Sequence, residues 1–248
     1  MMVVMARHTC VRSERAAGPT SPQRWPDDPS LAVATVLAVK NLTGAKSRLA
    51  PKSTPQHRAL VVAMLLDTVS AVRDAGIDRI VLVSPDPTVR DAAREAGAIA
   101  VAEPLSSTTD PHTGLSGLNL ALAQGCIEAR RRWPAITRVV LIQADLPSAT
   151  ATSIREALIE SVPHAQAMVT DRSGVGTAML IRGAEVSEPP RFGADSAAAH
   201  RDSGAVELDP HHRRWPDLRT DVDTLDDLQV ASALGLGART AAALAAQS

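Results

Sequence analysis

Short runs of consecutive apolar residues alternate along the chain with longer segments in which apolar residues recur at helical spacing. Unbroken apolar runs are typical of strands covered on both faces of a sheet, and the longer segments are typical of helices. Strands are expected at residues 34–39, 80–84, 99–102, 139–143, 167–170 and 178–181. Helices are expected at residues 55–75, 88–96, 115–131, 153–161, 195–203 and 225–234, followed by an Ala-rich C-terminal helix. This alternation predicts an α/β fold, with a mostly parallel twisted sheet and helices on both faces.

Residues 1–30 lack this pattern. They mix Arg, Ser and Pro without apolar periodicity, so we interpret them as a disordered N-terminal extension. Residues 31–248 are then expected to form one domain, since their number suits one large α/β domain. Ligands of such sheets bind at the carboxyl ends of the strands, so chemistry is expected in the segments that follow each strand.

The composition excludes several classes of protein. Aromatic residues make up only 2% of the chain and Tyr is absent, which argues against the base-stacking surfaces used for single-stranded nucleic acid. The net charge of -1 gives no field that would attract nucleic acid or anionic lipid. No apolar run is long enough to cross a membrane, and Cys10 and Cys126 form no disulfide framework, so a cytoplasmic protein is expected. The sequence does not fix the oligomeric state.

A basic loop follows the first expected strand. The chain has only three lysines, Lys40, Lys46 and Lys52, and all lie in this loop, whereas the other 23 basic residues are arginines. Compact ammonium groups clustered around Gly44 suit the phosphates of a nucleoside triphosphate, with Lys46 and Arg48 as the best candidates. The spacing does not match a P-loop. The alternative is an ordinary solvated loop.

Carboxylates follow two other segments. Asp145 comes directly after the fourth expected strand, and Asp221 and Asp223 occupy alternate positions of one extended segment, so their side chains share a face. Asp145 with one or both of the other two could hold Mg²⁺ through oxygen ligands. As the alternative, Thr224 and Asp227 form a capping-box-like pattern, and Asp223 then belongs to the start of that helix.

Three loops carry groups that suit an anion or a nucleotide. Residues 171–177 resemble a dinucleotide-binding G-x-G-x-x-G but lack its third glycine, so a phosphate-binding loop and a hairpin turn are equally good interpretations. Residues 191–196 open a helix whose free amides can bind an anion, with Ser196 either donating to that anion or capping the helix. Asn119, near the start of another helix, could read a base or sugar or simply begin the helix.

These segments occur in one order along the chain, and the combination resembles the guanylyltransferases of coenzyme F-420 biosynthesis, most closely the actinobacterial branch that uses phosphoenolpyruvate. The resemblance covers residues 31–248 and implies a nucleotide-diphospho-sugar-transferase-like sheet. It rests on residues 40–49, 143–147, 171–177, 191–196 and 221–224.

The resemblance also implies three sets of site residues. Phosphoenolpyruvate is held by Thr177, Gly193 and Ser196. The Mg²⁺ cofactor is bound by Asp145 with Asp221 or Asp223. Lys46 and Arg48 face the phosphates of GTP. With the analysis of the residues themselves, this gives Lys40, Lys46 and Asn119 as expected nucleotide contacts and Lys46, Arg48 and Asp145 as expected catalytic residues.

The implied reaction transfers GMP from GTP to phosphoenolpyruvate, giving enolpyruvoyl-2-diphospho-5'-guanosine and pyrophosphate. A phosphate nucleophile is already ionised at neutral pH, so positioning and charge neutralisation are sufficient and no catalytic base is needed. Transfer to 2-phospho-L-lactate, a molybdenum cofactor or a sugar phosphate stays open as an alternative. A catalytically silent nucleotide-binding regulator is the alternative from another class, and the three acidic residues argue against it because a binder needs no metal site.

Overall fold

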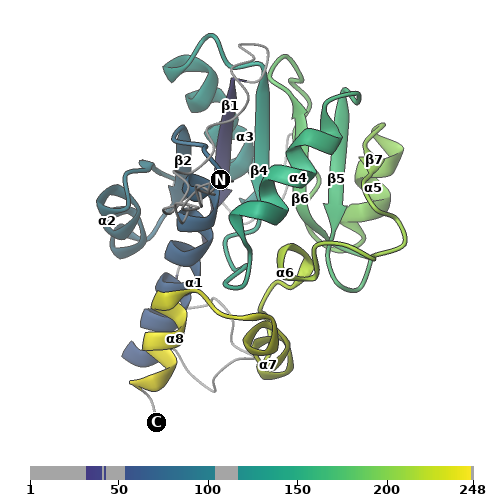
Figure 1. The fold of residues 1–248 in the computed structure, drawn as a ribbon. Coiled ribbons are helices and arrows are strands. Elements are labelled where there is room, and N and C mark those ends of the chain that lie inside the picture. Colours follow the sequence, from purple (N-terminus) through teal and green to yellow (C-terminus); the bar gives the residue numbers. More distant parts are fainter. Residues whose placement is uncertain (1–31, 41, 43–53, 104–116, 247–248) are drawn as a thin grey trace, which may run out of the picture.

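The structure is a computed structural model that describes residues 32–40, 42, 54–103 and 117–246 (Figure 1). Its strands are β1 (Val33–Ala38), β2 (Ile80–Ser84), β3 (Ile99–Ala102), β4 (Arg138–Ile142), β5 (Gln166–Thr170), β6 (Thr177–Gly183) and β7 (Val206–Glu207). Its helices are α1 (Pro55–Asp74), α2 (Pro87–Glu95), α3 (Gly117–Arg132), α4 (Ala151–Ser161), α5 (Ser196–Asp202), α6 (Pro216–Arg219), α7 (Leu225–Leu234) and α8 (Ala238–Ala245). No helix in these ranges is long and apolar enough to cross a membrane.

The strands of the described residues form one seven-stranded sheet in the order β3-β2-β1-β4-β6-β5-β7. Neighbouring strands are parallel except at β6, which is antiparallel to both β4 and β5. The expected α/β fold with a mostly parallel sheet is confirmed. The sequence pattern does not predict the reversed direction of β6. It also misses β7 and α6, because two and four residues are too few to show a periodic pattern.

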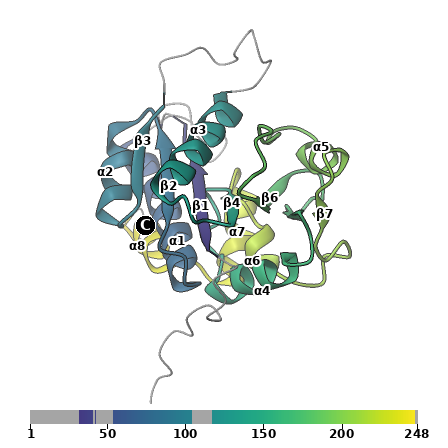
Figure 2. The ribbon, with the colours of Figure 1, turned by 90° about the horizontal axis from the view of Figure 1, so that it is seen from above.

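The sheet is covered by helices on both faces (Figure 2). Alternate residues of a strand point to opposite faces of the sheet, so the central strands contribute side chains to two hydrophobic clusters. Val33 and Leu37 of β1 pack in the cluster that contains apolar residues of α1, α2 and α4. Ala34 and Val36 of the same strand pack in the cluster that contains apolar residues of α3 and α5. Burial on both faces explains why β1 is apolar except for the buried Thr35 and shows no alternation.

Helix α1 begins where the sequence predicts. The hydroxyl of Thr54 accepts a hydrogen bond from the backbone amide of His57 at 3.1 Å, and Pro55 is the first helical residue. Gly76 follows the helix with a φ of 95°, a conformation that favours glycine. Both ends of the helix are thus set by local signals.

The carboxyl ends of β1, β4 and β5 lie at one edge of the sheet. Because β6 runs antiparallel to β4 and β5, its first residue, Thr177, lies at this same edge and pairs with Thr170 at the end of β5. Just past β4, the backbone amide of Gln143 donates to the carbonyl of Ala178 at 2.9 Å. The reversed strand therefore brings Thr177 next to the turn that follows β4.

A carboxylate of α1 caps the start of helix α8. The Asp67 side chain is buried and accepts hydrogen bonds from the backbone amides of Arg239 and Thr240, at 3.2 and 2.7 Å. These amides belong to the first turn of α8, whose N-cap residue, Gly237, has no side chain to accept them. A Cβ atom at Gly237 would come within 2.3 Å of the Asp67 carboxyl carbon, so this approach requires glycine.

We expect Asp67→Ala to lower the free energy of unfolding by about 1–3 kcal/mol, because it removes two hydrogen bonds and the cap of α8. Urea denaturation followed by circular dichroism measures the change. Asp74→Ala is the matched control, because Asp74 lies on the same helix with an exposed side chain. Equal stabilities of the two variants would show that α8 does not depend on Asp67.

Candidate active site

A cavity of about 300 Å³ lies at the carboxyl edge of the sheet, between the ends of β1 and β4. Its polar lining consists of Lys40, Gln143, Asp145 and Asp223, and its apolar lining comes from β1, α1 and α3. Lys40 is exposed and Asp145 is half-buried. The structure thus brings together one predicted nucleotide contact and two of the predicted metal ligands.

The backbone around Asp145 is fixed from two sides. On one side, the hydroxyl of Thr68 on α1 accepts from the amide of Leu146 at 3.1 Å and donates to the carbonyl of Met64 at 3.0 Å. On the other side, the amide of Val222 donates to the carbonyl of Asp145 at 3.0 Å. This last bond joins the turn after β4 to the segment that carries the other two acidic residues.

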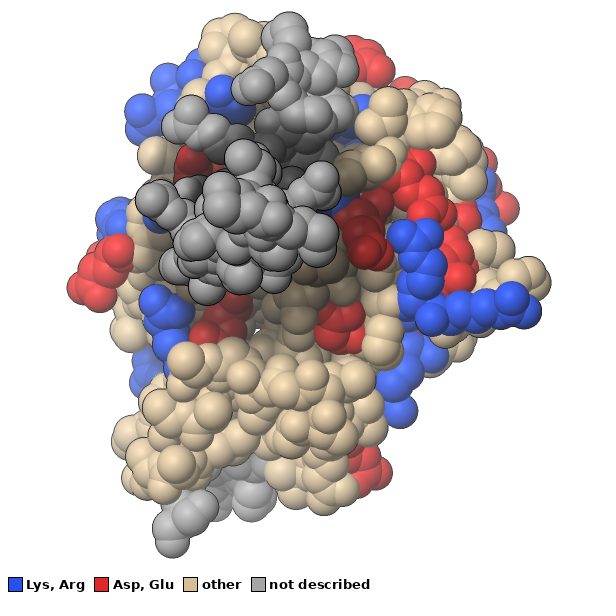
Figure 3. Space-filling view, viewed as in Figure 1, with Lys and Arg blue, Asp and Glu red and all other residues tan. Residues whose placement is uncertain are grey.

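Asp221 and Asp223 flank Val222, whose side chain is fully buried. Asp223 lines the cavity described above and also a second cavity of about 380 Å³, which Asp221 lines as well. In the space-filling view, the face is hollowed above the part where α7 and α8 lie, with acidic side chains at the rim (Figure 3). The two acids therefore share a polar region, as their alternate spacing predicts.

The carboxylates fit a metal ion that also binds substrate phosphates. Within the described ranges, no three His, Cys, Asp or Glu side chains are grouped closely enough to hold a metal ion by themselves. Mg²⁺ in nucleotide sites usually takes one or two carboxylates and completes its shell with phosphate oxygens and water. Asp145 and Asp223, which line one cavity, suit that arrangement, and the place of Asp221 in the set stays a prediction.

The helix-capping interpretation of this segment is also confirmed. Thr224 and Asp227 form a reciprocal capping box at the start of α7. The backbone amide of Asp223 donates to the Asp227 carboxylate at 3.3 Å, while the Asp223 side chain lines the two cavities. The cap and the candidate metal site therefore use different atoms of Asp223.

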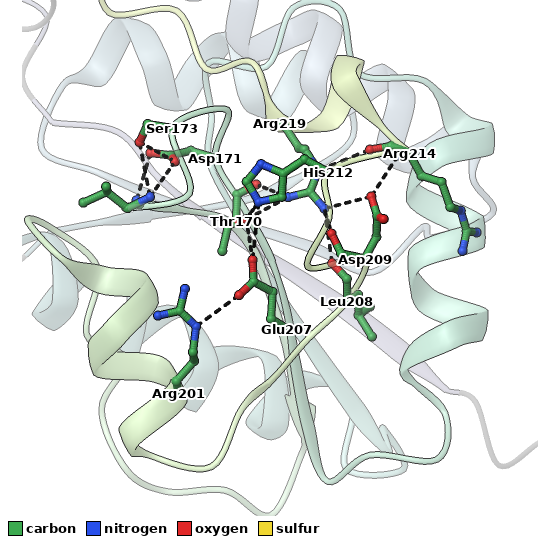
Figure 4. A network of polar contacts seen from close by, with 12 residues as sticks. Thr170, Asp171, Ser173, Arg201, Glu207, Leu208, Asp209, His212, Arg214 and Arg219 are labelled. Carbon is green, nitrogen blue, oxygen red and sulfur yellow. Dashed lines mark hydrogen bonds and ion pairs between the residues drawn. The ribbon is translucent and has the colours of Figure 1, made fainter.

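The segment that leads to Asp221 is anchored by the buried side chain of Arg219 (Figure 4). Its guanidinium donates to the carbonyl and hydroxyl of Thr170, at 3.0 and 2.7 Å, and to the carbonyl of Leu208 at 3.2 Å. It also forms an ion pair with Asp209 at 3.3 Å. Burial lowers the pKa of Arg219, and the charge of Asp209 opposes that shift. These contacts fix the chain just before the acidic residues.

Residues 171–176 form the turn of the β5–β6 hairpin. The Asp171 carboxylate accepts from the backbone amides of Val175 and Gly176, at 3.2 and 3.0 Å, and from the hydroxyl of Ser173 at 2.8 Å. These two amides are therefore occupied by the chain's own acid. Of the two interpretations of this loop, the structure shows the hairpin turn, and the phosphate-binding interpretation does not hold for these amides.

The residues predicted to bind phosphoenolpyruvate lie together where β6 and α5 begin. The hydroxyls of Thr177 and Ser196 are 3.2 Å apart, and both side chains are buried. Gly193 has a φ of 133°, and no atom lies within 4 Å of the position where its Cβ would stand. The backbone there is thus open to a ligand in a conformation that favours glycine.

Two side chains contact this group or the residue next to it, and the sequence did not predict either contact. His200 lies with its Nδ1 atom 2.9 Å from the Thr177 hydroxyl, and Asn119 forms two hydrogen bonds with the backbone of Phe192. Burial lowers the pKa of His200 to about 4, and the charges of Arg182 and Arg191 add to this shift. His200 is therefore neutral at pH 7.

The basic side of the site is described only in part. Lys46 and Arg48, the predicted phosphate contacts, lie outside the described residues, as does Lys52. Lys40 lines the cavity, and Glu103 at the end of β3 is close enough to interact with it. Burial raises the pKa of Glu103, and the charge of Lys40 opposes the rise.

Comparison with known proteins places the chain among nucleotidyltransferases. A family model described as "Guanylyl transferase CofC like" matches residues 33–193. The phosphoenolpyruvate guanylyltransferase of Mycolicibacterium vanbaalenii is 42% identical over 216 residues, which cover 86% of this chain and 95% of that protein.

Solved structures confirm the fold. A protein of Desulfovibrio desulfuricans G20 described as a nucleotide-diphospho-sugar transferase has a TM-score of 0.57 at 17% identity, covering 81% of this chain and 86% of its own. The 4-diphosphocytidyl-2C-methyl-D-erythritol synthase of Anaerococcus prevotii has a TM-score of 0.52 at 13% identity, covering 82% of this chain and 98% of its own. The sheet is thus nucleotide-diphospho-sugar-transferase-like, as expected.

The lowered pKa of His200 predicts a loss of stability in mild acid. Below the ordinary pKa of 6.5 the unfolded chain binds a proton that the folded protein does not, so stability falls as the pH decreases from 6.5 towards about 4. The loss over the whole window is on the order of 3 kcal/mol.

Urea unfolding between about pH 7 and pH 5 measures this dependence. We expect His200→Phe to reduce the decrease in unfolding free energy over this range, and His211→Phe, at an exposed position, to leave it unchanged. A His200→Phe variant with the wild-type dependence on pH would show that His200 does not stay neutral in the fold.

Proposed function

Because the chain belongs to the family of CofC-like guanylyl transferases, we propose that it transfers GMP from GTP to phosphoenolpyruvate, in the biosynthesis of coenzyme F-420. The products are enolpyruvoyl-2-diphospho-5'-guanosine and pyrophosphate. The name of the Mycolicibacterium vanbaalenii relative supports the choice of acceptor. The absence of a disulfide framework in the sequence supports a cytoplasmic location.

One observation carries the proposal: the carboxylate cavity and the group around Thr177 lie side by side at the same edge of the sheet. Gln143 lines the cavity, and its side-chain amide lies 3.4 Å from the carbonyl of Thr177. Asp145 follows two residues later. A metal-bound nucleotide phosphate and a phosphorylated acid would therefore meet between β4 and β6.

The residues of the chain divide the work. In the proposal, Thr177, Gly193 and Ser196 hold the acceptor. Lys40, Lys46 and Arg48 offset the negative charge of GTP. An oxygen of the acceptor phosphate forms a bond to the α-phosphorus of GTP as the bond from that phosphorus to pyrophosphate breaks. The nucleophile is already ionised, so no residue has to remove a proton.

The metal would be held by Asp145 with Asp223, or with Asp221. When bound, Mg²⁺ would neutralise the phosphate oxygens and hold them in line for displacement. Carboxylate oxygens are the ligands that Mg²⁺ prefers, and both cavities are polar where these acids line them.

We expect phosphoenolpyruvate to be guanylylated in preference to 2-phospho-L-lactate, sugar phosphates and a molybdenum cofactor precursor. Incubation with GTP, Mg²⁺ and each acceptor, with detection of pyrophosphate and mass analysis of the product, measures the preference. Phosphoenolpyruvate has a planar enol carbon where 2-phospho-L-lactate has a tetrahedral carbon that bears a methyl group, and such a difference in shape is worth about 1–3 kcal/mol in a fitted pocket. A dominant product from 2-phospho-L-lactate would change the acceptor and leave guanylyl transfer standing. No pyrophosphate with any acceptor would support a silent regulator.

We expect Asp145→Asn to lower Mg²⁺-dependent turnover by about 100-fold or more, because a neutral amide is a poor ligand for Mg²⁺. Its melting temperature should stay near that of the wild type, since the substitution preserves shape. Asp226→Asn is the matched control, because Asp226 is an exposed acid in the first turn of α7. Near-normal turnover of Asp145→Asn across a Mg²⁺ titration would remove Asp145 from the metal site.

A further inference from the structure

The segment between β6 and α5 carries two of the proposed acceptor residues and has no regular structure of its own. Gly193 and Ser196 lie in it or directly after it, and its backbone hydrogen bonds do not belong to a helix or strand ladder. Something other than secondary structure must therefore hold Phe192, the residue before Gly193. Two side chains do so, one from α3 and one from α5.

The first is Asn119 on α3. Its side-chain amide donates to the carbonyl of Phe192 at 2.9 Å, and its side-chain oxygen accepts from the amide of Phe192 at 2.8 Å. The Asn119 side chain is buried, and α3 packs on β1 and β2. The carboxamide therefore pairs with one backbone unit as a neighbouring strand would, and it links the loop to the half of the sheet that carries Lys40.

The second is His200 on α5. Its Nε2 atom accepts from the backbone amide of Arg191 at 3.1 Å, so in the neutral ring the proton is on Nδ1, which donates to the Thr177 hydroxyl at 2.9 Å. Its ring meets the ring of Phe192 edge to face, with centroids 5.1 Å apart. His200 thus fixes the loop and the Thr177 side chain together.

The order of protons around His200 has a chemical result. Thr177 accepts from His200, and a single proton lies between the hydroxyls of Thr177 and Ser196. The two hydroxyls carry two protons in all, and one of these lies between them. The other proton can be donated to a group other than Thr177, Ser196 and His200. The pair therefore offers a donor, which suits the carboxylate or phosphate oxygen of an anion. The lowered pKa of His200 agrees with the neutral ring that this order requires.

We propose that Asn119 and His200 are positioning residues for the phosphorylated carboxylic acid, holding the loop of Gly193 and Ser196 from two sides. The proposal rests on the proposed function and assigns Asn119 to the acceptor side of the site, in place of the nucleotide contact predicted from the sequence. Neither side chain has to touch the acceptor. Loss of either one loosens the loop and weakens acceptor binding, while GTP binding stays as it is.

Steady-state kinetics with GTP and phosphoenolpyruvate varied separately test the proposal. For Asn119→Ala and His200→Phe we expect KM for phosphoenolpyruvate to rise about tenfold or more, and KM for GTP to change by less than about twofold. His200→Phe keeps an aromatic ring beside Phe192 and removes both hydrogen bonds of the imidazole. Asp67→Ala is the control for lost stability, because it lowers the stability of the fold far from this loop and should leave the ratio of the two KM values unchanged.

Three results would overturn the proposal. A rise in KM for GTP with an unchanged KM for phosphoenolpyruvate in Asn119→Ala would return Asn119 to the nucleotide. A fall in kcat with both KM values unchanged would mean that Asn119 and His200 act on the chemical step and not on acceptor binding. The same split in Asp67→Ala would show that any loss of stability produces it.

Failure of the proposed function is seen separately, in wild-type protein that releases no pyrophosphate with any acceptor. Calorimetric titration with phosphoenolpyruvate then replaces the kinetics. Weaker binding to Asn119→Ala and His200→Phe than to wild type supports the positioning role without turnover. Equal binding to all three proteins, or no binding to wild type, overturns it.

Discussion

A buried guanidinium has to have its hydrogen bonds satisfied, and the acidic side of the site depends on how Arg219 meets this requirement. Its donors reach Thr170 at the end of β5 and the backbone of Leu208 after β7, and its own carbonyl accepts from the amide of Arg172 in the hairpin. The charge is offset by Asp209. Removing a buried ionised group from water is costly, so this set of partners permits few other arrangements of the chain. The backbone just before Asp221 and Asp223 is therefore fixed by Arg219.

Proximity of acidic side chains is itself unfavourable before a cation binds. The fold holds them together with backbone contacts, such as the bond from the amide of Val222 to the carbonyl of Asp145, and with the Thr68 hydroxyl beneath the turn. These contacts are made by backbone atoms and a hydroxyl, and the carboxylates of the three acids line the two cavities. In the proposed reaction this arrangement prepares the site, because the ligands need not be gathered when the nucleotide arrives.

How much could be predicted from sequence depends on whether the information is local. Apolar runs gave the long strands and helices, and the caps at Thr54 and Thr224 are set by residues three positions away, so both are confirmed. The direction of β6 could not be predicted, because an apolar run reads the same for either direction. The contacts of Asn119 with Phe192 and of Arg219 with Thr170 join distant parts of the chain. No spacing of residues along the sequence predicts such contacts. His200 lies in a short helix, and nothing in the sequence pattern of that helix indicates that its ring contacts Thr177.

The side chain of Asn119 forms its hydrogen bonds with Phe192 through the main-chain atoms of that residue, and this has an evolutionary consequence. A bond to the backbone amide and carbonyl does not depend on the side chain at that position, so Asn119 can hold residue 192 whatever its side chain, whereas the ring contact with His200 requires an aromatic residue there. The strands β5 and β6, the loop and α5 also form one continuous stretch of the chain, from Gln166 to Asp202. In the proposed reaction, mutations confined to this stretch can therefore change the acceptor preference while the residues proposed to contact GTP, Lys40, Lys46 and Arg48, stay unchanged.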